Sequence, residues 1–329
     1  MKKTLLFVSL FALLSNSLSA QITDADAQKA LRTQSTDTIF GWTVSGLVSI
    51  NAANTMLVNW IAGGNNTLGF ESTGSIFANV RTKRFVWENN LNAALGTMRQ
   101  GNTHRDKFLK TNDRLQFNSK YGQRAYRNFF YSALVNAQTQ MLIGKNYSND
   151  TTYTIISRFW APAQILTAIG MDYNPNANLS VFVSPISARM TFVHDQTLAN
   201  AGAFGVTPAI IDPATGAIIT PGQRSLCQYG GYVSISYKKN SWRWELLKNV
   251  MYITNLNLFS NYVENPQNIK VDWSNQLLFK VNKYITFMFS NQFLYDDVVK
   301  VKDTNGDGVF DATGGQYKQI TSLGFAFNF

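Results

Sequence analysis

The sequence predicts an all-β protein: a transmembrane, antiparallel, up-and-down β-barrel of about 12 strands with short periplasmic turns and longer extracellular loops. Three observations support this prediction. Hydrophobic residues make up 45% of the 329 residues and charged residues only 15%, against ~25% charged in an average soluble domain. The apolar residues alternate with polar ones, as in strands that have one apolar and one polar face. The connections between the alternating segments are short and long in turn, which is typical of outer-membrane barrels.

The N-terminus has the three regions of a secretory signal peptide. Lys2 and Lys3 give a positive start, residues 5–14 an apolar stretch, and residues 15–20 a small, polar end. Leu18 stands where a small residue is usual before the cleavage site, so an uncleaved anchor is the alternative. We expect residues 1–20 to be a signal peptide, residues 21–40 a short periplasmic segment and residues 41–329 the barrel.

Alternation marks the expected strands. In residues 42–50 the even positions are apolar or glycine and most odd positions carry Ser or Thr. No apolar run after residue 21 reaches the roughly 18 residues of a membrane-spanning helix. Pro162 and Pro185 cannot donate ladder hydrogen bonds, so they predict a bulge or a break in their segments. The expected strands are residues 41–51, 67–80, 85–98, 113–122, 129–142, 153–173, 179–194, 226–238, 242–260, 269–281, 284–296 and 316–329.

The connections between these segments alternate in length. Short ones are expected at residues 81–84, 123–128, 174–178, 239–241 and 282–283. Longer ones are expected at residues 52–66, 99–112, 143–152, 195–225, 261–268 and 297–315. A β-sandwich has no reason to separate its loops by length, whereas a barrel with both termini in the periplasm does so.

The C-terminal segment carries a further signal. Large apolar residues occupy every second position up to the end of the chain, namely Leu323, Phe325, Phe327 and Phe329. This arrangement resembles the C-terminal strand that outer-membrane barrels present to their insertion machinery. An edge strand this aromatic would promote aggregation in a soluble protein. We therefore expect an integral outer-membrane location, with outer-membrane lipids and the barrel insertion machinery as partners.

Seven short segments of the chain are similar to those of one family. They are residues 59–65 (NWIAGGN), 118–122 (NSKYG), 157–162 (SRFWAP), 170–176 (GMDYNPN), 199–206, 264–268 (ENPQN) and 281–284 (VNKY). The family that they resemble is an uncharacterised one from the outer membranes of Bacteroidetes, known only as domain of unknown function 3078. The resemblance covers roughly residues 40–300. It implies the barrel and the compartment but no activity, because none is assigned to the family.

Residues 303–311 match the first part of a calcium-binding loop. Side-chain oxygens fall at relative positions 1, 3, 5 and 9, a glycine at position 6 and a backbone carbonyl at position 7. The expected ligands are Asp303, Asn305, Asp307, Asp311 and the carbonyl of Val309. Position 12 is Gly314 instead of a bidentate glutamate, so the expected extracellular calcium site is weak. A polar turn is the alternative.

Charged residues on the polar faces of the expected strands predict a water-filled lumen. Those faces carry Glu71, Glu88, Arg114, Lys120, Arg243, Glu245, Lys270 and Asp272. A lumen closed to water would have to pair every one of these charges at a considerable desolvation cost. We therefore expect a narrow pore for small hydrophilic solutes. A structural or assembly scaffold with an interaction loop at residues 195–225 is the alternative, and whether the lumen is open discriminates between the two.

Enzyme activity has little support in the sequence. One cysteine and two histidines leave little material for a metal cluster or for histidine-based catalysis. His194 beside Asp195 is the one candidate position for the catalytic site of a lipid-modifying enzyme. We expect no enzyme activity.

The chain has a formal net charge of +10, and two groups of its basic residues stand out. One group lies at the expected periplasmic turns and is taken as solvated charge at the membrane edge: Arg81, Lys83, Arg84, Arg124, Arg127, Lys238, Lys239 and Lys283. The other lies in the 99–112 loop, where Arg99, Arg105, Lys107 and Lys110 would meet lipid phosphates. Nucleic acid is not expected as a partner in this compartment, and the sequence identifies no protein partner.

Overall fold

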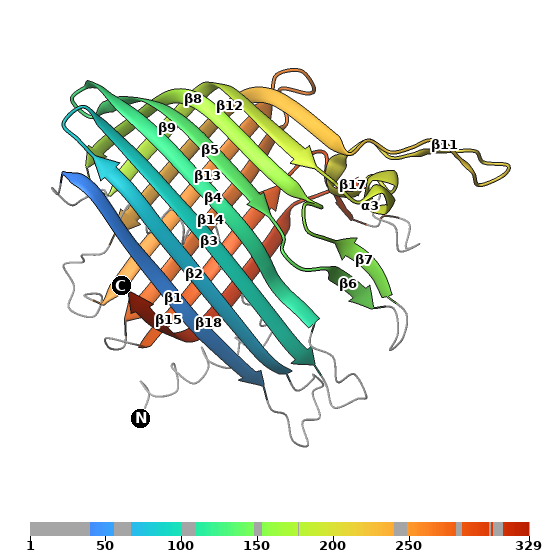
Figure 1. The fold of residues 1–329 in the computed structure, drawn as a ribbon, viewed down its shortest axis with the longest axis horizontal. Helices are drawn as coiled ribbons and strands as arrows, with labels where there is room; N and C mark the ends of the chain where they lie inside the picture. Colours follow the sequence, from blue (N-terminus) through green and yellow to red (C-terminus); the bar gives the residue numbers. More distant parts are fainter. Residues whose placement is uncertain are drawn as a thin grey trace, which may run out of the picture.

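Twelve strands form one closed antiparallel barrel in the computed structural model (Figure 1). The structure describes residues 40–55, 67–100, 109–147, 153–176, 178–239, 249–280, 285–302, 304 and 312–328. Around the barrel the order is β1-β18-β15-β14-β13-β12-β9-β8-β5-β4-β3-β2. Each barrel strand therefore pairs with the barrel strands before and after it in the chain, and β1 pairs with β18. This confirms the predicted all-β, up-and-down fold and its strand number.

The twelve barrel strands each overlap one expected segment. Their bounds are β1 Gly41–Thr55, β2 Thr67–Arg81, β3 Phe85–Gln100, β4 Leu109–Tyr126, β5 Phe129–Thr139, β8 Ala163–Asn176, β9 Leu179–Phe192, β12 Ser225–Lys239, β13 Val250–Asn261, β14 Ile269–Lys280, β15 Ile285–Tyr295 and β18 Gln316–Asn328. The elements outside the barrel are β6 Gly144–Tyr147, β7 Tyr153–Ser157, α3 Gln196–Asn200, η1 Ala203–Gly205, β10 Ile210–Ile211, β11 Ile218–Thr220, β16 Lys300–Lys302 and β17 Ala312–Thr313. Within the described residues, no helix has the length and apolar content needed to cross a membrane.

The two prolines interrupt their segments as expected. Before Pro162 the chain reverses in a tight turn, in which Arg158 and Ala161 exchange backbone hydrogen bonds of 2.9 and 3.0 Å. The expected 153–173 strand is therefore split into β7, which pairs with β6 outside the barrel, and β8. Around Pro185 the pairing of β8 with β9 shifts register, which is a β-bulge. At that point a Cβ on Gly170 would lie 2.0 Å from the Val183 carbonyl oxygen, so only glycine fits.

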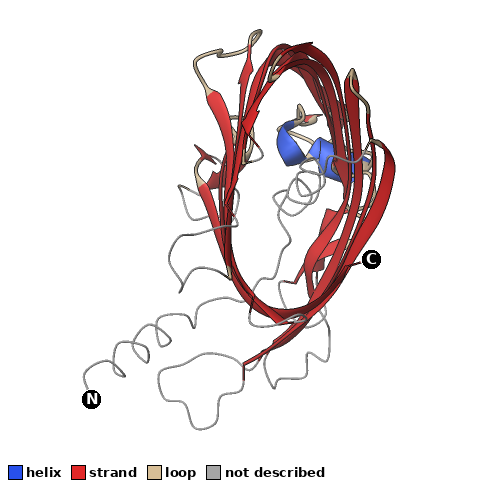
Figure 2. Cartoon of the chain, turned by 90° about the vertical axis from the view of Figure 1, so that its left-hand side faces the viewer, coloured by secondary structure: helices blue, strands red, loops and turns tan. Residues whose placement is uncertain are grey.

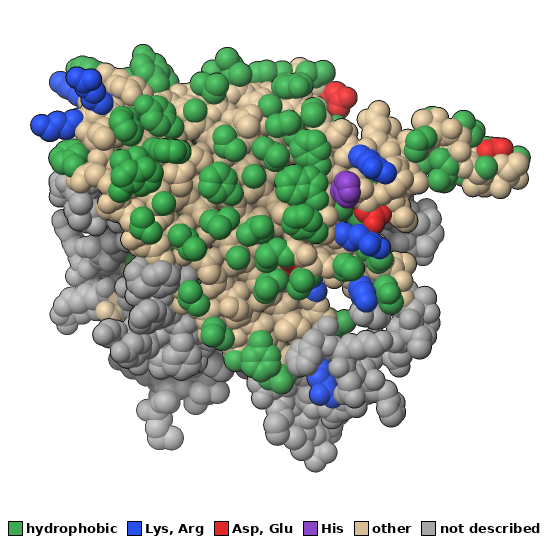
Figure 3. Space-filling view, viewed as in Figure 1, with side chains coloured by type: hydrophobic (Ala, Val, Ile, Leu, Met, Phe, Trp, Pro, Cys, Tyr) green, Lys and Arg blue, Asp and Glu red, His purple; other side chains and the backbone are tan. Residues whose placement is uncertain are grey.

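The two faces of the barrel wall differ in chemistry. Apolar side chains on alternate positions point outward, and Ile50 and Ile169 are 61% and 63% exposed. Figure 3 shows such side chains spread over the barrel wall. Polar side chains on the other positions point inward, where Asn90, Asn255 and Gln276 are at most 1% exposed. The alternation in the sequence therefore sorts apolar groups to the outside and polar groups to the lumen.

The barrel has one end of tight turns, called here the turn end, and one end of longer excursions, called the loop end. At the turn end β2 and β3 are joined by residues 82–84, β4 and β5 by residues 127–128, and β8 and β9 by residues 177–178. Figure 1 places these turns together, next to the start of β1. The expected separation of short from long connections holds at these three turns. It does not hold between β12 and β13. β12 ends at Lys239 and β13 begins at Val250, so the expected turn at residues 239–241 is too short and the expected strand 242–260 starts too early.

The 195–225 excursion folds over the loop end. Its α3 and η1 turns pack in an apolar cluster made by Ala161, Val193, Leu198, Ala199 and Val206. Figure 2 shows these helical turns within the outline of the strands. The β10–β11 hairpin, in contrast, projects away from the barrel (Figure 1).

Several sequence predictions concern residues outside the described part of the chain. They include the signal peptide, most of the 21–40 segment, Arg105, Lys107, Lys283 and Phe329. Arg99 and Lys110 were wrongly expected in a loop. Arg99 lies in β3. Lys110 lies in β4, where its ammonium nitrogen is 2.9 Å from a carboxylate oxygen of Asp113 and 2.8 Å from the side-chain oxygen of Gln140. Lys110 therefore links β4 to the residue that follows β5.

Substitution of an outward-facing residue by arginine tests which surface of the barrel contacts lipid. β8 has 14 residues, so at ~3.3 Å per residue and a tilt of ~40° it advances about 35 Å, more than the ~25 Å apolar band of a membrane barrel. Ile169 lies near its middle. We expect Ile169→Arg to lower the free energy of unfolding in phospholipid vesicles by about 2–4 kcal/mol, measured by denaturant titration.

Ile211→Arg is the matched control, because Ile211 is 55% exposed but belongs to the projecting hairpin. That variant should unfold like the unsubstituted protein. Equal losses in the two variants would contradict an outward face that contacts lipid at Ile169.

Candidate functional site

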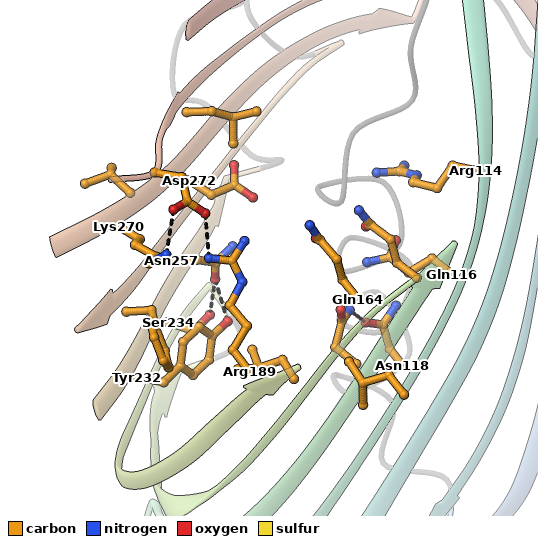
Figure 4. A pocket seen from close by; sticks show the side chains of 18 of the residues that line it. Arg114, Gln116, Asn118, Gln164, Arg189, Tyr232, Ser234, Asn257, Lys270 and Asp272 are labelled. Carbon is orange, nitrogen blue, oxygen red and sulfur yellow. Dashed lines mark hydrogen bonds and ion pairs between the residues drawn. The ribbon is translucent and has the colours of Figure 1, made fainter. Parts of the chain in front are cut away.

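The candidate functional site is a cavity of about 550 Å³ inside the barrel. Figure 4 shows polar side chains that face each other across it. Arg114, Gln116, Asn118 and Gln164 come from β4 and β8, and Arg189, Tyr232, Asn257, Lys270 and Asp272 from the wall made by β9, β12, β13 and β14. A volume of this size lies within the range of small-molecule sites.

A ladder of amide side chains begins at the cavity wall, which Asn136 and Asn118 line. The Asn136 amide donates to the Asn118 side-chain oxygen, and the Asn118 amide donates to Asn90 at 3.3 Å. The ladder continues from Asn90 to Asn92 and to the hydroxyl of Ser75. It therefore crosses four neighbouring strands, from β5 to β2, and holds their inward side chains in place without ionic charge.

The facing wall combines hydroxyl, amide and carboxylate groups. The side-chain oxygen of Asn257 accepts from the Tyr232 hydroxyl at 2.9 Å and from the Ser234 hydroxyl at 2.8 Å. The Gln292 amide donates to Asp272 at 2.8 Å. Because most of these groups donate or accept without a full charge, the wall suits neutral polar solutes and water.

An apolar patch interrupts the polar lumen. Ala168, Phe182, Tyr232 and Phe259 form one buried cluster, with the Phe182 and Tyr232 ring centroids 6.2 Å apart. Lys120 lies 5.5 Å from the centroid of the Phe182 ring and pairs with Asp172. Asp172 also accepts from Ser180 at 3.0 Å and from Asn174 at 2.9 Å. The charge of Lys120 is therefore compensated inside the lumen.

At the loop end, Asp296 joins two strands to the start of the last loop. Its carboxylate oxygens lie 2.8 Å from an Arg189 guanidinium nitrogen and 2.6 Å from the Lys270 ammonium nitrogen. Lys270 is also 3.2 Å from Asp297, and the backbone N–H of Val298 donates to Asp296 at 3.1 Å. Burial alone would raise the pKa of Asp296, but Arg189 and Lys270 outweigh it and hold this pKa below its usual value.

The 195–225 excursion contacts the chain next to Asp296 at the loop end. Phe204, in η1, lines the cavity. The next residue, Gly205, has a φ of +87°, and a Cβ there would lie 2.8 Å from a methyl carbon of Val298. The excursion therefore packs closely on the chain that follows Asp296, and it narrows the cavity at the loop end.

The structure brings five of the eight expected lumen residues to the cavity wall, namely Glu88, Arg114, Lys120, Lys270 and Asp272. Glu71 is buried away from the cavity and accepts from Asn112 at 2.6 Å. Arg243 and Glu245 lie outside the described residues. Glu88, Arg114 and Asp272 each interact with other groups of the chain as well.

The sequence prediction missed three charged residues of the cavity, Asp113, Arg189 and Asp296. Inward positions of β9 are even up to Ser184, but after the bulge at Pro185 they are odd, beginning with Ser187. Arg189 therefore falls out of the phase that its segment predicts. Asp296 does follow the inward phase of Gln292 and Leu294, so its position was available from the sequence.

The sequence offers two candidate positions for chemistry, the expected metal ligands and His194 beside Asp195. In the described part of the chain, no group of three His, Cys, Asp or Glu side chains is placed to hold a metal ion. The expected calcium ligands, Asp303, Asn305, Asp307, Val309 and Asp311, lie outside the described residues, so that site stays a prediction. Asp195 accepts backbone hydrogen bonds of 2.9 and 3.1 Å at the start of α3 and pairs with Arg158 at 2.8 Å. Its carboxylate therefore serves the local fold beside the exposed His194.

The comparisons with known proteins agree with the family resemblance. A family model described as "Protein of unknown function (DUF3078)" matches residues 52–147. This match is to the uncharacterised family that the sequence segments resemble, over that part of the chain. No curated protein matches the chain at a significant level.

The chain is also similar to several solved structures. The translocator domain of the autotransporter NalP from Neisseria meningitidis is 10% identical, with 93% of this chain and 96% of that chain covered and a TM-score of 0.41. An outer membrane channel from Pseudomonas putida F1 is 8% identical, with 89% and 97% covered and a TM-score of 0.39. The NanC porin is 7% identical, with 86% and 97% covered and a TM-score of 0.34. At these values the similarities say nothing about what this chain binds or conducts.

Removing the Asp296 carboxylate tests its role at the loop end. Asp296→Asn leaves the guanidinium of Arg189 without this partner, so we expect the free energy of unfolding at pH 7 to fall by about 3 kcal/mol. Because the pKa of Asp296 is lowered in the folded state, its stabilisation is present above the unfolded value of ~3.9 and disappears as the pH falls through the lower, folded value.

The measurement is denaturant unfolding between pH 2 and pH 7. The unsubstituted protein should lose stability more steeply below about pH 4 than Asp296→Asn does. Glu264→Gln, which removes an exposed carboxylate of the 262–268 connection, is the control and should leave the stability at pH 7 unchanged. Superimposable pH profiles of the unsubstituted protein and Asp296→Asn would count against the role of this carboxylate.

Proposed function

We propose that the chain is an integral outer-membrane β-barrel, exported with removal of residues 1–20, whose lumen is a narrow pore for small hydrophilic solutes. The observation that carries this proposal is the cavity of about 550 Å³, lined largely by polar side chains inside a closed barrel with an apolar outer wall. Backbone groups of a closed barrel are all paired between strands, which is what a lipid environment requires.

The charges around the cavity support weak charge selectivity. The charged residues on its wall are four basic and four acidic ones: Arg114, Lys120, Arg189, Lys270, Glu88, Asp113, Asp272 and Asp296. Rings of one sign select ions of the other sign, and a balanced set has no such preference. Neutral polar solutes and small ions of either sign are therefore the proposed cargo.

The pore is narrow because the inward side chains are packed beside the cavity. Asn90 and Asn255 are almost completely buried, and the amide ladder holds neighbouring side chains in place. A barrel of 12 strands lies between the packed case of about 8 strands and the open porins of about 16. The proposed conductance is correspondingly small.

A scaffold role is the second candidate, and one feature favours it. The projecting β10–β11 hairpin exposes Ile210, Ile211, Ile218 and Ile219, each more than half accessible to solvent. A pore has no need of such a hairpin, whereas an extracellular interaction loop does. The two candidates differ in whether the barrel conducts.

Planar-bilayer recording distinguishes them. We expect the refolded protein to show small single-channel conductance and replacement of residues 196–224 by a short Gly/Ser linker to raise it severalfold, because Phe204 and its neighbours no longer narrow the lumen. Replacement of residues 210–219 alone, which removes only the projecting hairpin, should leave the conductance unchanged. If neither the unsubstituted protein nor the 196–224 variant conducts, the pore proposal fails and the scaffold role takes its place.

Single substitutions on the cavity wall should tune ion selectivity in opposite directions. In a salt gradient the reversal potential of the unsubstituted protein should lie near that of a non-selective pore. Arg114→Gln should shift it toward cations and Asp272→Asn toward anions, because each removes one charge from a balanced set. Lys145→Gln removes an exposed charge outside the cavity and should shift nothing. A shift of the same sign in Arg114→Gln and Asp272→Asn would contradict the assignment of these residues to the conducting path.

A further inference from the structure

We propose that the rim of the barrel at its β2–β3 and β4–β5 turns binds the phosphate headgroups of anionic phospholipids. The proposal goes beyond the pore and rests on the membrane placement proposed above. It concerns four exposed cations, Lys83, Arg84, Arg124 and Arg127, called here the basic rim. From the sequence alone these residues were taken as solvated charge.

The first pair of cations is projected by an ordered turn. The Thr82 hydroxyl oxygen accepts from the backbone N–H of Phe85 at 2.9 Å and of Arg84 at 3.2 Å, and the Thr82 backbone N–H donates to the Phe85 carbonyl at 2.9 Å. These bonds close a tight turn around Lys83 and Arg84. Both side chains therefore start from a fixed backbone and extend outward.

The second pair of cations lies over aromatic rings. The Arg124 guanidinium carbon is 5.8 Å from the centroid of the Phe130 ring, and that of Arg127 is 5.2 Å from the centroid of the Tyr126 ring. Tyr126 is itself 64% exposed. Stacking on a ring limits the freedom of a guanidinium and leaves its N–H donors directed to the side, which suits a phosphate.

Backbone hydrogen bonds join the turns into one rim. Arg124 N–H donates to the Arg84 carbonyl at 2.8 Å, which links the two cationic turns directly. Asn174 N–H donates to the Asn128 carbonyl at 2.9 Å, which links the second turn to the start of the next one. In Figure 3 basic side chains gather at the corner where Figure 1 places these turns. The four cations are therefore neighbours on one edge.

No described carboxylate pairs with the basic rim. Glu88 and Asp172 are the carboxylates nearest to this end of the barrel along their strands. Glu88 lines the cavity, and Asp172 is buried and pairs with Lys120. The cations of the rim take part in none of the ion pairs that the described residues form. Their charge is therefore compensated by an external anion or solvated by water.

An aromatic belt beside the rim argues for lipid as the source of that anion. Phe85 stacks on Tyr121 with centroids 5.6 Å apart, and Phe129 on Tyr173 at 4.6 Å. Trp42 and Trp87 make an edge contact at 6.0 Å on the same outward wall. Tyr and Trp belts sit at the level of lipid headgroups, so cations just beyond the belt lie at the depth of lipid phosphates. An anion that is free in solution has no acyl chains to contact these aromatic rings, so the belt would not favour its binding.

The test compares lipid preference in full-length protein reconstituted into vesicles. Quenching of tryptophan fluorescence by brominated phosphatidylglycerol and by brominated phosphatidylcholine gives the relative binding constant of the two lipids. We expect the unsubstituted protein to prefer phosphatidylglycerol, and Arg124→Gln/Arg127→Gln to lower that preference roughly threefold or more. Arg124→Lys/Arg127→Lys retains the charge and should keep most of the preference, even if the stacking is weaker.

Lys145→Gln/Lys300→Gln is the matched control. It removes two exposed cations at the loop end, one of which, Lys145, lies 4.2 Å from the centroid of the Tyr153 ring. This variant should keep the preference of the unsubstituted protein, and millimolar inorganic phosphate should not compete. An unchanged preference in Arg124→Gln/Arg127→Gln overturns the proposal, as does equal loss in the control.

The same vesicles separate this proposal from the pore. Quenching by both lipids reports that the chain is inserted, independently of conduction. If the protein is inserted and prefers phosphatidylglycerol but does not conduct, the basic rim stands and the pore fails. If neither lipid quenches, the membrane placement fails and the rim proposal fails with it.

Discussion

Pairing of the first strand with the last is the interaction on which the rest of the structure depends. β1 and β18 pair antiparallel from Leu47 opposite Asn328 to Asn51 opposite Gly324. Without this seam the sheet would have two long edges with unpaired backbone groups, which in lipid cost several kcal/mol each and in water promote aggregation. With the seam, the alternation of each strand becomes a division between an outer wall and a lumen.

Closure also decides the chemistry of the lumen. Charged groups that face inward have less contact with bulk water than groups on the outer surface of a soluble protein, so pairing with an opposite charge stabilises them. Lys120 with Asp172, and Arg189 and Lys270 with Asp296, form such pairs with side chains from strands that are far apart in the sequence. Because these charges are paired, the other polar groups that line the cavity are mainly amides and hydroxyls. The lumen therefore combines an electrically balanced wall with room for small polar molecules.

Much of the fold could be predicted from the sequence, because strand alternation is a local property. A period of two, turn residues and loop lengths depend on neighbours in the chain, and all twelve segments correspond to barrel strands. The break before β8 and the bulge in β9 also had a local cause, in Pro162 and Pro185. The 105–107 part of the expected basic loop lies outside the described residues, and Lys110 proved to belong to β4 because its strand begins earlier than its pattern indicated.

Two parts of the site escaped prediction because strand alternation alone does not show them. The bulge at Pro185 changes the phase of β9, so Arg189 turns inward although its position in the segment predicts otherwise. Phe204 reaches the cavity only because α3 packs on Ala161 and Val193, which belong to other parts of the chain. Neither effect leaves a periodic signal in the sequence. The partner of a given inward charge is likewise set by the barrel and not by its own strand.

Disulfide cross-linking of the seam tests closure of the barrel most directly. In a Cys227→Ser background, Ser49→Cys and Ala326→Cys lie on residues that the register places opposite each other, at a Cα separation of about 4.5–5.5 Å that a disulfide can bridge. The account predicts that mild oxidation of the refolded protein links this pair efficiently, and that Ser49→Cys with Phe325→Cys, one residue out of register, links poorly. An absent link in the first pair, or equal linking in both, would contradict the closed twelve-strand barrel.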